Sequence, residues 1–257
     1  MQCSHSAVEM LRDRLWSAEQ TRRAIRLPDD GFVVPHEVAA YAVQHALFEL
    51  RASPLLGFKL GGTVRPLPGE DRRSYGTLSA WHRVGMQGGS VDLSRFMQPC
   101  VEPEIALRLG RELAGEGHDR ASVAAHLDAV LPALEIADTR YAAFPASLPD
   151  NIADNSSSGA VVFGEPVTWR SGRDLRAETV RFLVDGNCEG EGCGADVMGD
   201  PLAALGWLAG RLAQDGRVLP AGTIVITGGI TPSAVASAGR VFRAEFSSIG
   251  HVELRFY

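Results

Sequence analysis

Apolar residues recur at three- and four-residue steps in some parts of the chain and at two-residue steps in others. The first pattern predicts helices over residues 5–26, 35–52, 120–130 and 201–214. The second, together with short apolar runs, predicts strands, and these lie at 55–62, 101–110, 131–141, 159–167, 178–186, 222–229 and 250–257. Strands do not alternate regularly with helices, so the pattern argues against a Rossmann fold or a TIM barrel.

Residues 63–90 show neither pattern. They are rich in Pro, Gly, Arg and Ser, which favours an irregular segment that is a candidate lid or mobile loop. No linker or repeat interrupts the rest, so we expect residues 1–257 to form a single domain. In this division residues 1–54 are a helical N-terminal part and residues 55–257 a β-rich catalytic body.

The composition narrows the class of protein. The chain has 257 residues, 45% hydrophobic content and a net charge of −6, which is ordinary for a soluble globular protein and argues against a nucleic-acid partner. No apolar run approaches the roughly 18–20 residues that span a membrane, and the first residues do not resemble a signal peptide. The four cysteines match no usual disulfide or zinc pattern, so we expect free thiols and a cytoplasmic location.

Three carboxylates stand out against this background. In a strand over 101–110, Glu102 and Glu104 lie on the same face, because alternate side chains point the same way. Glu135 lies inside an apolar run, where an ionised carboxylate is costly unless it is paired or bound to a metal. Oxygen ligands without His or Cys suit Mg²⁺ or Mn²⁺. The alternative is that the first two face solvent and Glu135 pairs with an arginine such as Arg140.

Three further segments offer polar chemistry. Lysine is scarce compared with arginine, and Lys59 lies between apolar residues, where it can hold an anion or move a proton if burial lowers its pKa. The alternative is a lysine at a strand end that reaches solvent. Residues 151–160 and 226–231 are rich in Asn, Asp, Ser, Thr and Gly, so each is either an anion-binding loop or a simple turn.

Taken in order, these segments resemble the 2-keto-4-pentenoate hydratase / 4-oxalocrotonate decarboxylase family of the fumarylacetoacetate hydrolase superfamily. The resemblance covers nearly the whole chain. It rests on AYAVQ, GFKLGGT, SYGTL, VEPEIALRL, PALEIADTRY, IADNSSSG and the segment from DPLAALGWL to TGGIT. It implies an α+β fold, a mixed β-roll of the fumarylacetoacetate hydrolase type with N-terminal helices.

The resemblance also implies a site. By family position, Glu102, Glu104 and Glu135 are metal ligands for Mg²⁺ or Mn²⁺, and Lys59 and Asp154 are catalytic. The residues expected to border the substrate are Tyr75, Ser156, Ser157, Gly229 and Thr231. The implied partners are a small 2-oxo acid substrate, further copies of the chain in a homo-oligomer, and a pathway enzyme in complex with it.

The reaction implied is that of a lyase. VEPEIA and TGGIT are more similar to decarboxylases, which favours a 4-oxalocrotonate (2-oxo-3-hexenedioate) decarboxylase, with 2-hydroxypenta-2,4-dienoate hydratase as the alternative. Val64 departs from the usual serine, and the segment up to Tyr75 is shorter than usual and carries Pro66 and Pro68. This departure leaves open a non-catalytic or recruited member that binds an oxo acid or a partner enzyme.

Overall fold

The computed structural model describes residues 5–27, 33–64, 71–85, 87–145 and 147–257. Its α-helices are α1 (His5–Thr21), α2 (Glu37–Arg51), α3 (Arg120–Ala124), α4 (Leu148–Ala153) and α5 (Pro201–Gln214). Its strands are β1 (Leu55–Gly61), β2 (Ser74–Ser79), β3 (Gly89–Val91), β4 (Cys100–Leu109), β5 (Leu127–Ala137), β6 (Ser158–Phe163), β7 (Val167–Thr168), β8 (Thr179–Val184), β9 (Asn187–Cys193), β10 (Ile224–Ile226), β11 (Ala234–Val235), β12 (Val241–Phe246) and β13 (Gly250–Phe256). Short 3-10 helices lie at Ala80–His82, Leu93–Arg95, Asn155–Ser157, Leu175–Ala177 and Gly194–Asp196.

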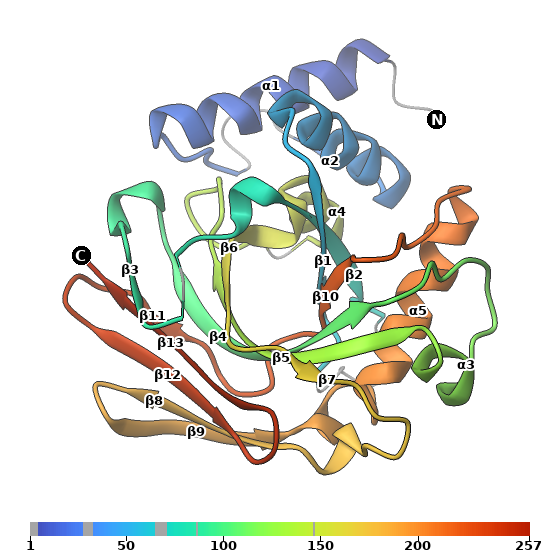
Figure 1. Cartoon of the computed structure of the whole chain (residues 1–257). Helices are drawn as coiled ribbons and strands as arrows, with labels where there is room; N and C mark the ends of the chain where they lie inside the picture. Colours follow the sequence, from blue (N-terminus) through green and yellow to red (C-terminus); the bar gives the residue numbers. More distant parts are fainter. Residues whose placement is uncertain (1–4, 28–32, 65–70, 86, 146) are drawn as a thin grey trace.

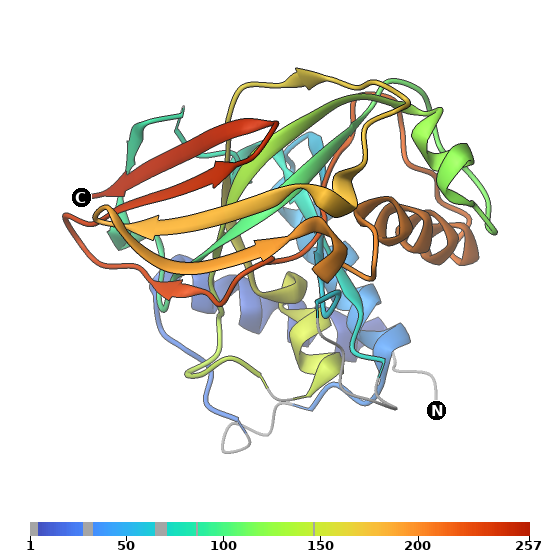
Figure 2. The same ribbon diagram turned by 90° about the horizontal axis from the view of Figure 1, so that it is seen from below.

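The strands form two sheets. The eight-stranded sheet has the order β2-β1-β10-β4-β5-β6, with β11 paired to β4 and β7 paired to β5. It curls into a roll in Figure 1, with the helices and the second sheet outside the curl. The five-stranded sheet has the order β3-β13-β12-β8-β9 and packs against the roll, as Figure 2 shows from below. This mixed β-roll confirms the expected α+β class.

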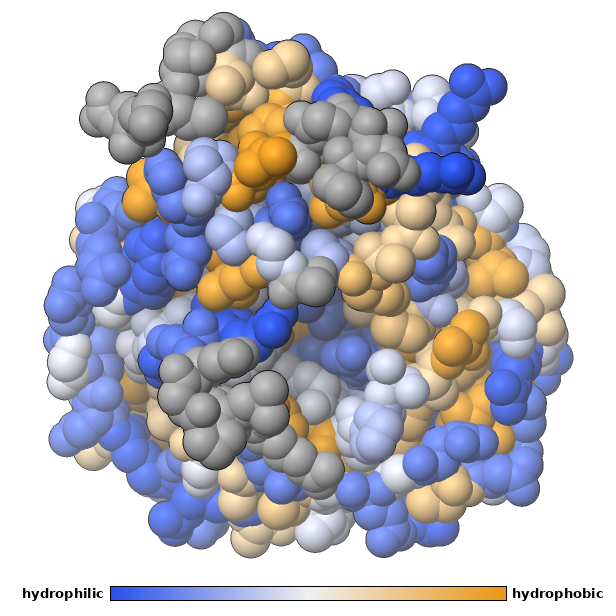
Figure 3. All heavy atoms as spheres, turned by 180° about the vertical axis from the view of Figure 1, so that it is seen from behind, coloured by the Kyte–Doolittle hydropathy of each residue, from blue (hydrophilic) through white to orange (hydrophobic). Residues whose placement is uncertain are grey.

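Local chemistry explains where the main helices begin and end. The His36 side chain accepts a hydrogen bond from the backbone N–H of Ala39 at the start of α2, and Ala52 ends that helix in a left-handed conformation. Asp200 caps the N-terminus of α5, and Pro201 occupies its first turn. Among the described helices none is both long and apolar enough to cross a bilayer. Figure 3 shows polar and apolar side chains interspersed over the face seen from behind.

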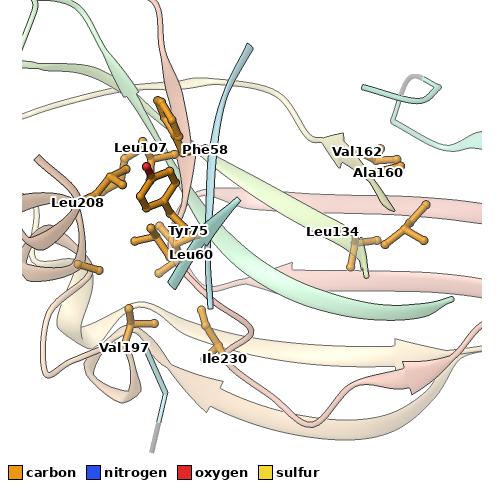
Figure 4. Close-up of a cluster of buried hydrophobic side chains, with 14 of the residues drawn as sticks. Phe58, Leu60, Tyr75, Leu107, Leu134, Ala160, Val162, Val197, Leu208 and Ile230 are labelled. Carbon is orange, nitrogen blue, oxygen red and sulfur yellow. The ribbon is translucent and has the colours of Figure 1, made fainter. Parts of the chain in front are cut away.

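The two faces of the rolled sheet differ in what they bury. The outer face packs on the helices and the second sheet, and Figure 4 shows Phe58, Leu60, Tyr75, Leu107 and Leu208 of this core together. The inner face carries a separate apolar cluster rich in small residues: Leu78, Ala106, Ala129, Leu131, Ala133, Val161, Phe163, Ile224 and Ile226. Because strand residues alternate between faces, the side chains next to Phe58 and Leu107 along the chain point inward.

The structure corrects several of the predicted elements. Segment 63–90 is not wholly irregular, because its buried residues Ser74–Ser79 form β2; residues 65–70, including Pro66 and Pro68, lie outside the described residues. The predicted helix over 120–130 ends at Ala124, and β5 begins at Leu127. Of the cysteines, Cys100, Cys188 and Cys193 are free thiols, as expected, and Cys3 is not among the described residues.

Candidate metal centre

Three carboxylates meet on the inner face of the roll. Glu102 and Glu104 come from β4, and Glu135 comes from β5 directly opposite Glu102 in the antiparallel register. One ligand oxygen of each residue lies within 4.8 Å of the others. Glu104 and Glu135 are fully buried, while Glu102 is partly exposed. Strand alternation therefore places the two glutamates of β4 as predicted, and the strand register brings the third beside them.

Most of the buried oxygens in this cluster accept no hydrogen bond from the described residues. Neither oxygen of Glu135, nor Oε1 of Glu104, accepts a hydrogen bond from the residues that the structure describes. The other oxygen of Glu104 accepts one from the backbone N–H of Gly228 at 2.5 Å. Buried carboxylate oxygens without donors are costly. A bound cation removes that cost, so the donor set fits a divalent metal ion with hard, oxygen-preferring character.

Crowding shifts the acidity of these groups. Burial, and then the charge of Glu135, raises the pKa of Glu102 from 4.5 to about 7. The same causes raise the pKa of Glu104 well above its ordinary value. Without a cation the cluster therefore holds protons at pH values where exposed glutamates have lost them.

Among the described residues, the cation paired with this cluster is Lys59, on the inner face of β1. It is the only lysine among 25 lysines and arginines in the chain, and it is 6% exposed rather than reaching solvent. Its Nζ lies 3.2 Å from Oε1 of Glu135 and donates a hydrogen bond to the carbonyl oxygen of Ser156 at 2.8 Å. Burial alone lowers the pKa of Lys59, but Glu135, Glu104 and Glu102 outweigh it and raise that pKa. The shift is opposite to the one expected from burial alone.

The Ser156 carbonyl belongs to an unusual turn. Asn155, Ser156 and Ser157 have φ values of 54°, 52° and 55°, so three consecutive residues other than glycine adopt the left-handed conformation. Such residues cost about 1–2 kcal/mol each. The turn is therefore held by its surroundings: the Ser156 hydroxyl donates to the Ser74 hydroxyl, and the Ser157 hydroxyl donates to the Asn151 side chain.

Asp154, just before this turn, does not point at the carboxylates. Its side-chain oxygens accept hydrogen bonds from the Thr139 hydroxyl at 2.8 Å and from the backbone N–H and Nε of Arg140 at 3.1 and 2.5 Å. Burial raises the pKa of Asp154, although the Arg140 charge opposes that shift. Arg140 thus pairs with Asp154, whereas Glu135 pairs with Lys59; the alternative pairing of Glu135 with Arg140 is absent from the described contacts.

The remaining predicted residues divide into two groups. Gly229 lies against the cluster, because a Cβ added there would be 2.5 Å from Oε2 of Glu102. Tyr75 is opposite Leu60 on the outer face, away from Lys59, and its hydroxyl lies 3.1 Å from Nε2 of His45. The Thr231 hydroxyl donates to the Pro232 carbonyl. The structure brings Ser156 and Gly229 to the cluster and does not bring Tyr75 there.

Two contributors to the site were missed from the sequence. Ser74 lies on the inner face opposite Gly61, and its hydroxyl oxygen accepts a hydrogen bond from the Ser156 hydroxyl. Gly228 has a φ of 115° and donates its N–H to Glu104, and a Cβ there would meet the Thr63 hydroxyl at 1.9 Å. The paired glycines of TGG were a signal for a backbone donor, whereas Ser74 lay within the SYGTL segment but was given no role.

The fold and the carboxylate cluster define an enzyme class with known members. The family described as fumarylacetoacetate (FAA) hydrolase C-terminal matches residues 80–257. The solved structure of 4-oxalocrotonate decarboxylase from Pseudomonas putida G7, complexed with magnesium and adipate, has a TM-score of 0.92 and 30% identity, covering 100% of this chain and 99% of that one. The chain therefore belongs to the fumarylacetoacetate hydrolase family, as the resemblance predicted.

The sequence relatives include both kinds of enzyme considered above, a decarboxylase and a hydratase. The chain is 34% identical to a 4-oxalocrotonate decarboxylase of Pseudomonas putida over 223 residues, covering 84% of each chain. It is 33% identical to 2-keto-4-pentenoate hydratase 1 of Dechloromonas aromatica (strain RCB) over 248 residues, covering 94% of each. Both relatives are lyases, so the comparisons support a lyase and support both of the reactions considered.

Proposed function

We propose that the protein is a divalent-metal-dependent lyase acting on a small 2-oxo or 2-hydroxy-dienoic acid. The observation that carries the proposal is the cluster of Glu102, Glu104 and Glu135, whose ligand oxygens lie within 4.8 Å of one another and include buried oxygens without described donors. These three side chains hold one Mg²⁺ or Mn²⁺ ion, since both prefer oxygen ligands. When bound, such an ion supplies a Lewis acid that stabilises negative charge on the oxo acid.

Lys59 acts in this proposal as a fixed positive charge. An ammonium group has three hydrogens, of which one is donated to the Ser156 carbonyl, while its charge is paired with Glu135 at 3.2 Å. In this proposal another of its hydrogens reaches a substrate oxygen or is delivered as a proton. The raised pKa of Lys59 favours the protonated form, so this residue serves as a donor rather than as a base.

The other predicted residues take supporting places. Ser156 and Gly229 border the substrate, because both lie beside the charged cluster. Ser157 and Thr231 are further wall residues, whereas Tyr75 supports β1 from its outer face. Asp154 acts through its contacts with Arg140 and Thr139. A water or proton positioned by Asp154 would require that carboxylate to leave those partners.

Decarboxylation of 2-oxo-3-hexenedioate is the favoured reaction. In it, the bond to the distal carboxylate breaks, CO₂ leaves, and the electron pair moves through the conjugated system toward the 2-oxo oxygen. Hydration of 2-hydroxypenta-2,4-dienoate is the alternative, in which protonation of the dienol precedes addition of water. Support for the first comes from the 4-oxalocrotonate decarboxylase fold match, and support for the second from the hydratase relatives.

The test supplies each acid with Mg²⁺ or Mn²⁺ and follows CO₂ release and loss of diene absorbance. We expect one of the two to turn over, and EDTA to abolish turnover. Glu104→Gln should remove activity and weaken metal binding. Asp128→Asn is the matched control, because Asp128 is an exposed carboxylate that pairs with Arg108 further along the same two strands. Metal binding without turnover of either acid would refute both lyase reactions and favour a non-catalytic, recruited member.

We also propose that the chain forms a homo-oligomer. Support comes from large apolar side chains that are exposed in the single chain, among them Val235 and Tyr257 at 75% and 66%. Sedimentation velocity should give a mass of two or more chains of 27.5 kDa each, and the mass of one chain would refute the proposal. Co-elution with an enzyme that supplies the oxo acid would extend the proposal to a partner complex.

A further inference from the structure

The left-handed turn at Asn155–Ser157 delivers one group to the candidate site, the carbonyl oxygen of Ser156. That oxygen is 2.8 Å from Nζ of Lys59. A right-handed backbone at these residues would send the carbonyl in another direction. The direction of the Lys59 ammonium therefore depends on a conformation that Ser156 and Ser157 disfavour, so contacts elsewhere in the structure must enforce it.

Arg140 holds both ends of that turn. One terminal nitrogen of its guanidinium donates to the carbonyl of Asp154 at 2.9 Å, and the other donates to the carbonyl of Ser158 at 2.9 Å. Its Nε is bonded to the Asp154 carboxylate. The guanidinium is planar and rigid, so these contacts fix the spacing between residues 154 and 158. Arg140 is 6% exposed and water does not compete strongly with these contacts.

Asn155 fastens the same turn to β2. Its side-chain oxygen accepts from the backbone N–H of Thr77 at 2.7 Å, and its side-chain nitrogen donates to the Thr77 carbonyl at 3.0 Å. The neighbouring residue of β2, Gly76, makes the approach possible. A Cβ at Gly76 would lie 2.4 Å from the Asn155 carbonyl oxygen and 3.0 Å from Cγ of Lys59.

We propose that Arg140 and Asn155 are positioning residues for Lys59. They enforce the left-handed turn whose Ser156 carbonyl fixes the Lys59 ammonium against Glu135, and neither contacts the substrate. The inference rests on the proposed role of Lys59 in the lyase reaction. A purely structural role, in which Arg140 only neutralises Asp154, predicts a loss of stability with no change in the direction of Lys59.

The kinetic test compares Arg140→Lys and Asn155→Gly with Arg51→Lys. Arg51 is the matched control because it is a largely buried arginine bonded through two nitrogens to Glu19, and it has no described contact with the turn. Lysine keeps the charge beside Asp154 but cannot span two carbonyls, and glycine tolerates a positive φ but loses the contacts to Thr77. We expect kcat to fall by about 10²-fold in both test variants, as for a misplaced reacting group, with KM and metal affinity nearly unchanged. Arg51→Lys should lower stability and leave kcat unchanged.

A second readout does not depend on turnover. Because Lys59 is the only lysine, protein grown with ¹³C- and ¹⁵N-labelled lysine gives one set of side-chain NMR signals. We expect two distinct Hε shifts in the native protein and in Arg51→Gln, since the ammonium is held in one direction. In Arg140→Gln and Asn155→Gly the two shifts should converge. Asn155→Gly carries the test if Arg140→Gln does not fold.

The outcomes separate the two proposals. Unchanged Lys59 signals in a folded Asn155→Gly variant would overturn the positioning role, whatever the activity. If the Lys59 signals converge in the variants and the native protein turns over neither acid, the positioning role is supported and the lyase reactions are refuted. Unchanged kcat in both Arg140→Lys and Asn155→Gly would also overturn the inference.

Discussion

Two buried pairs of a carboxylate and a cation lie close together in the fold. They differ in how many of their polar atoms have hydrogen-bond partners. In the Arg140–Asp154 pair, the carboxylate accepts from Thr139 and from two nitrogens of Arg140, and the rest of the guanidinium donates to backbone carbonyls. In the Lys59–Glu135 pair, one cation faces three carboxylates, and both Glu135 oxygens lack described hydrogen bonds. The first pair is satisfied by the protein alone, and the second requires another cation.

The difference distinguishes a structural charge from a functional one. Burial by itself does not distinguish them, because all four residues are at most 6% exposed. A buried ion pair stabilises a fold only when its remaining hydrogen-bonding groups find partners. Where they do not, the fold has retained an unfavourable group, and a bound ligand is the simplest physical reason.

The largest effect is expected from Glu135→Gln, which removes one charge from the incomplete pair. Glutamine has nearly the same shape but is a poor ligand, so affinity for Mg²⁺ or Mn²⁺ should fall by more than about 100-fold, given that even outer contacts of a metal site contribute 10–100-fold. Titration calorimetry measures the affinity. In the native protein, metal at 100 times its Kd should add about 2.7 kcal/mol of stability. An equal gain in the variant would refute the ligand assignment.

Asp154→Asn should act on the complete pair in the opposite way. It leaves the buried Arg140 charge without a partner, which typically costs about 3–5 kcal/mol of unfolding free energy. Metal affinity should stay within a few-fold of the native value, because no ligand changes. Urea denaturation with and without metal measures both. A variant of native stability would show that the Arg140–Asp154 pair contributes little to the fold.

Intermediate effects are expected from pH in the metal-free protein. The pKa of Glu102 rises from 4.5 to about 7 on folding, so the folded state binds more protons than the unfolded state between these values. This carboxylate therefore lowers stability as pH rises through that window. His45 and His82 act oppositely, because burial lowers their pKa values from 6.5 to about 4 and about 3. The difference in Tm between the native protein and Glu102→Gln isolates the carboxylate.

With EDTA present, the variant should gain stability over the native protein as pH rises from 4.5 to 8 in buffers that bracket the two Glu102 pKa values. Saturating Mg²⁺ should reverse the order, since the ion favours the ionised form. A constant difference across the range would contradict the raised pKa.

The smallest effect is expected at the exposed pair of Arg108 and Asp128, whose Nε and Oδ1 are 2.8 Å apart with side chains 35% and 44% exposed. Exposed pairs contribute about 0–1 kcal/mol, so Arg108→Ala should change the unfolding free energy by less than about 1 kcal/mol. Urea denaturation provides the measurement. A loss comparable to that of Asp154→Asn would show that burial does not separate these pairs.

The parts of the site that depend on local patterns could be predicted from the sequence, and those that depend on contacts between distant segments could not. Alternation within one strand placed Glu102 and Glu104 on the same face, and the cost of burial marked Glu135. The direction of Tyr75 depends on the register between β1 and β2, which puts it opposite Leu60 on the outer face. No local pattern specifies that register, so a substrate contact for Tyr75 could not be checked from the sequence.

Other features could not be predicted from the sequence, because no local pattern indicates them. β2 is buried on both faces, so its residues do not alternate between apolar and polar. β9 carries two glycines, which favoured turns. β12 alternates half-buried and buried residues, but this alternation spans only six residues and was not predicted as a strand. The left-handed turn is opposed by local preference at Ser156 and Ser157, and the contacts that fasten it to Arg140 and β2 are non-local. Asp154 pairs with Arg140 across fourteen residues, a contact that spacing did not indicate.

The position of β10 has a consequence for how the chain folds during synthesis. This strand lies between β1 and β4, parallel to the first and antiparallel to the second. While Ile224–Ile226 remain inside the ribosome, the edges of β1 and β4 that they will cover have no partner. Gly228, which holds Glu104, arrives later still. A nascent chain therefore carries Glu102, Glu104 and Glu135 long before it can close the roll around them, so the proposed ion binding would report that the roll has closed.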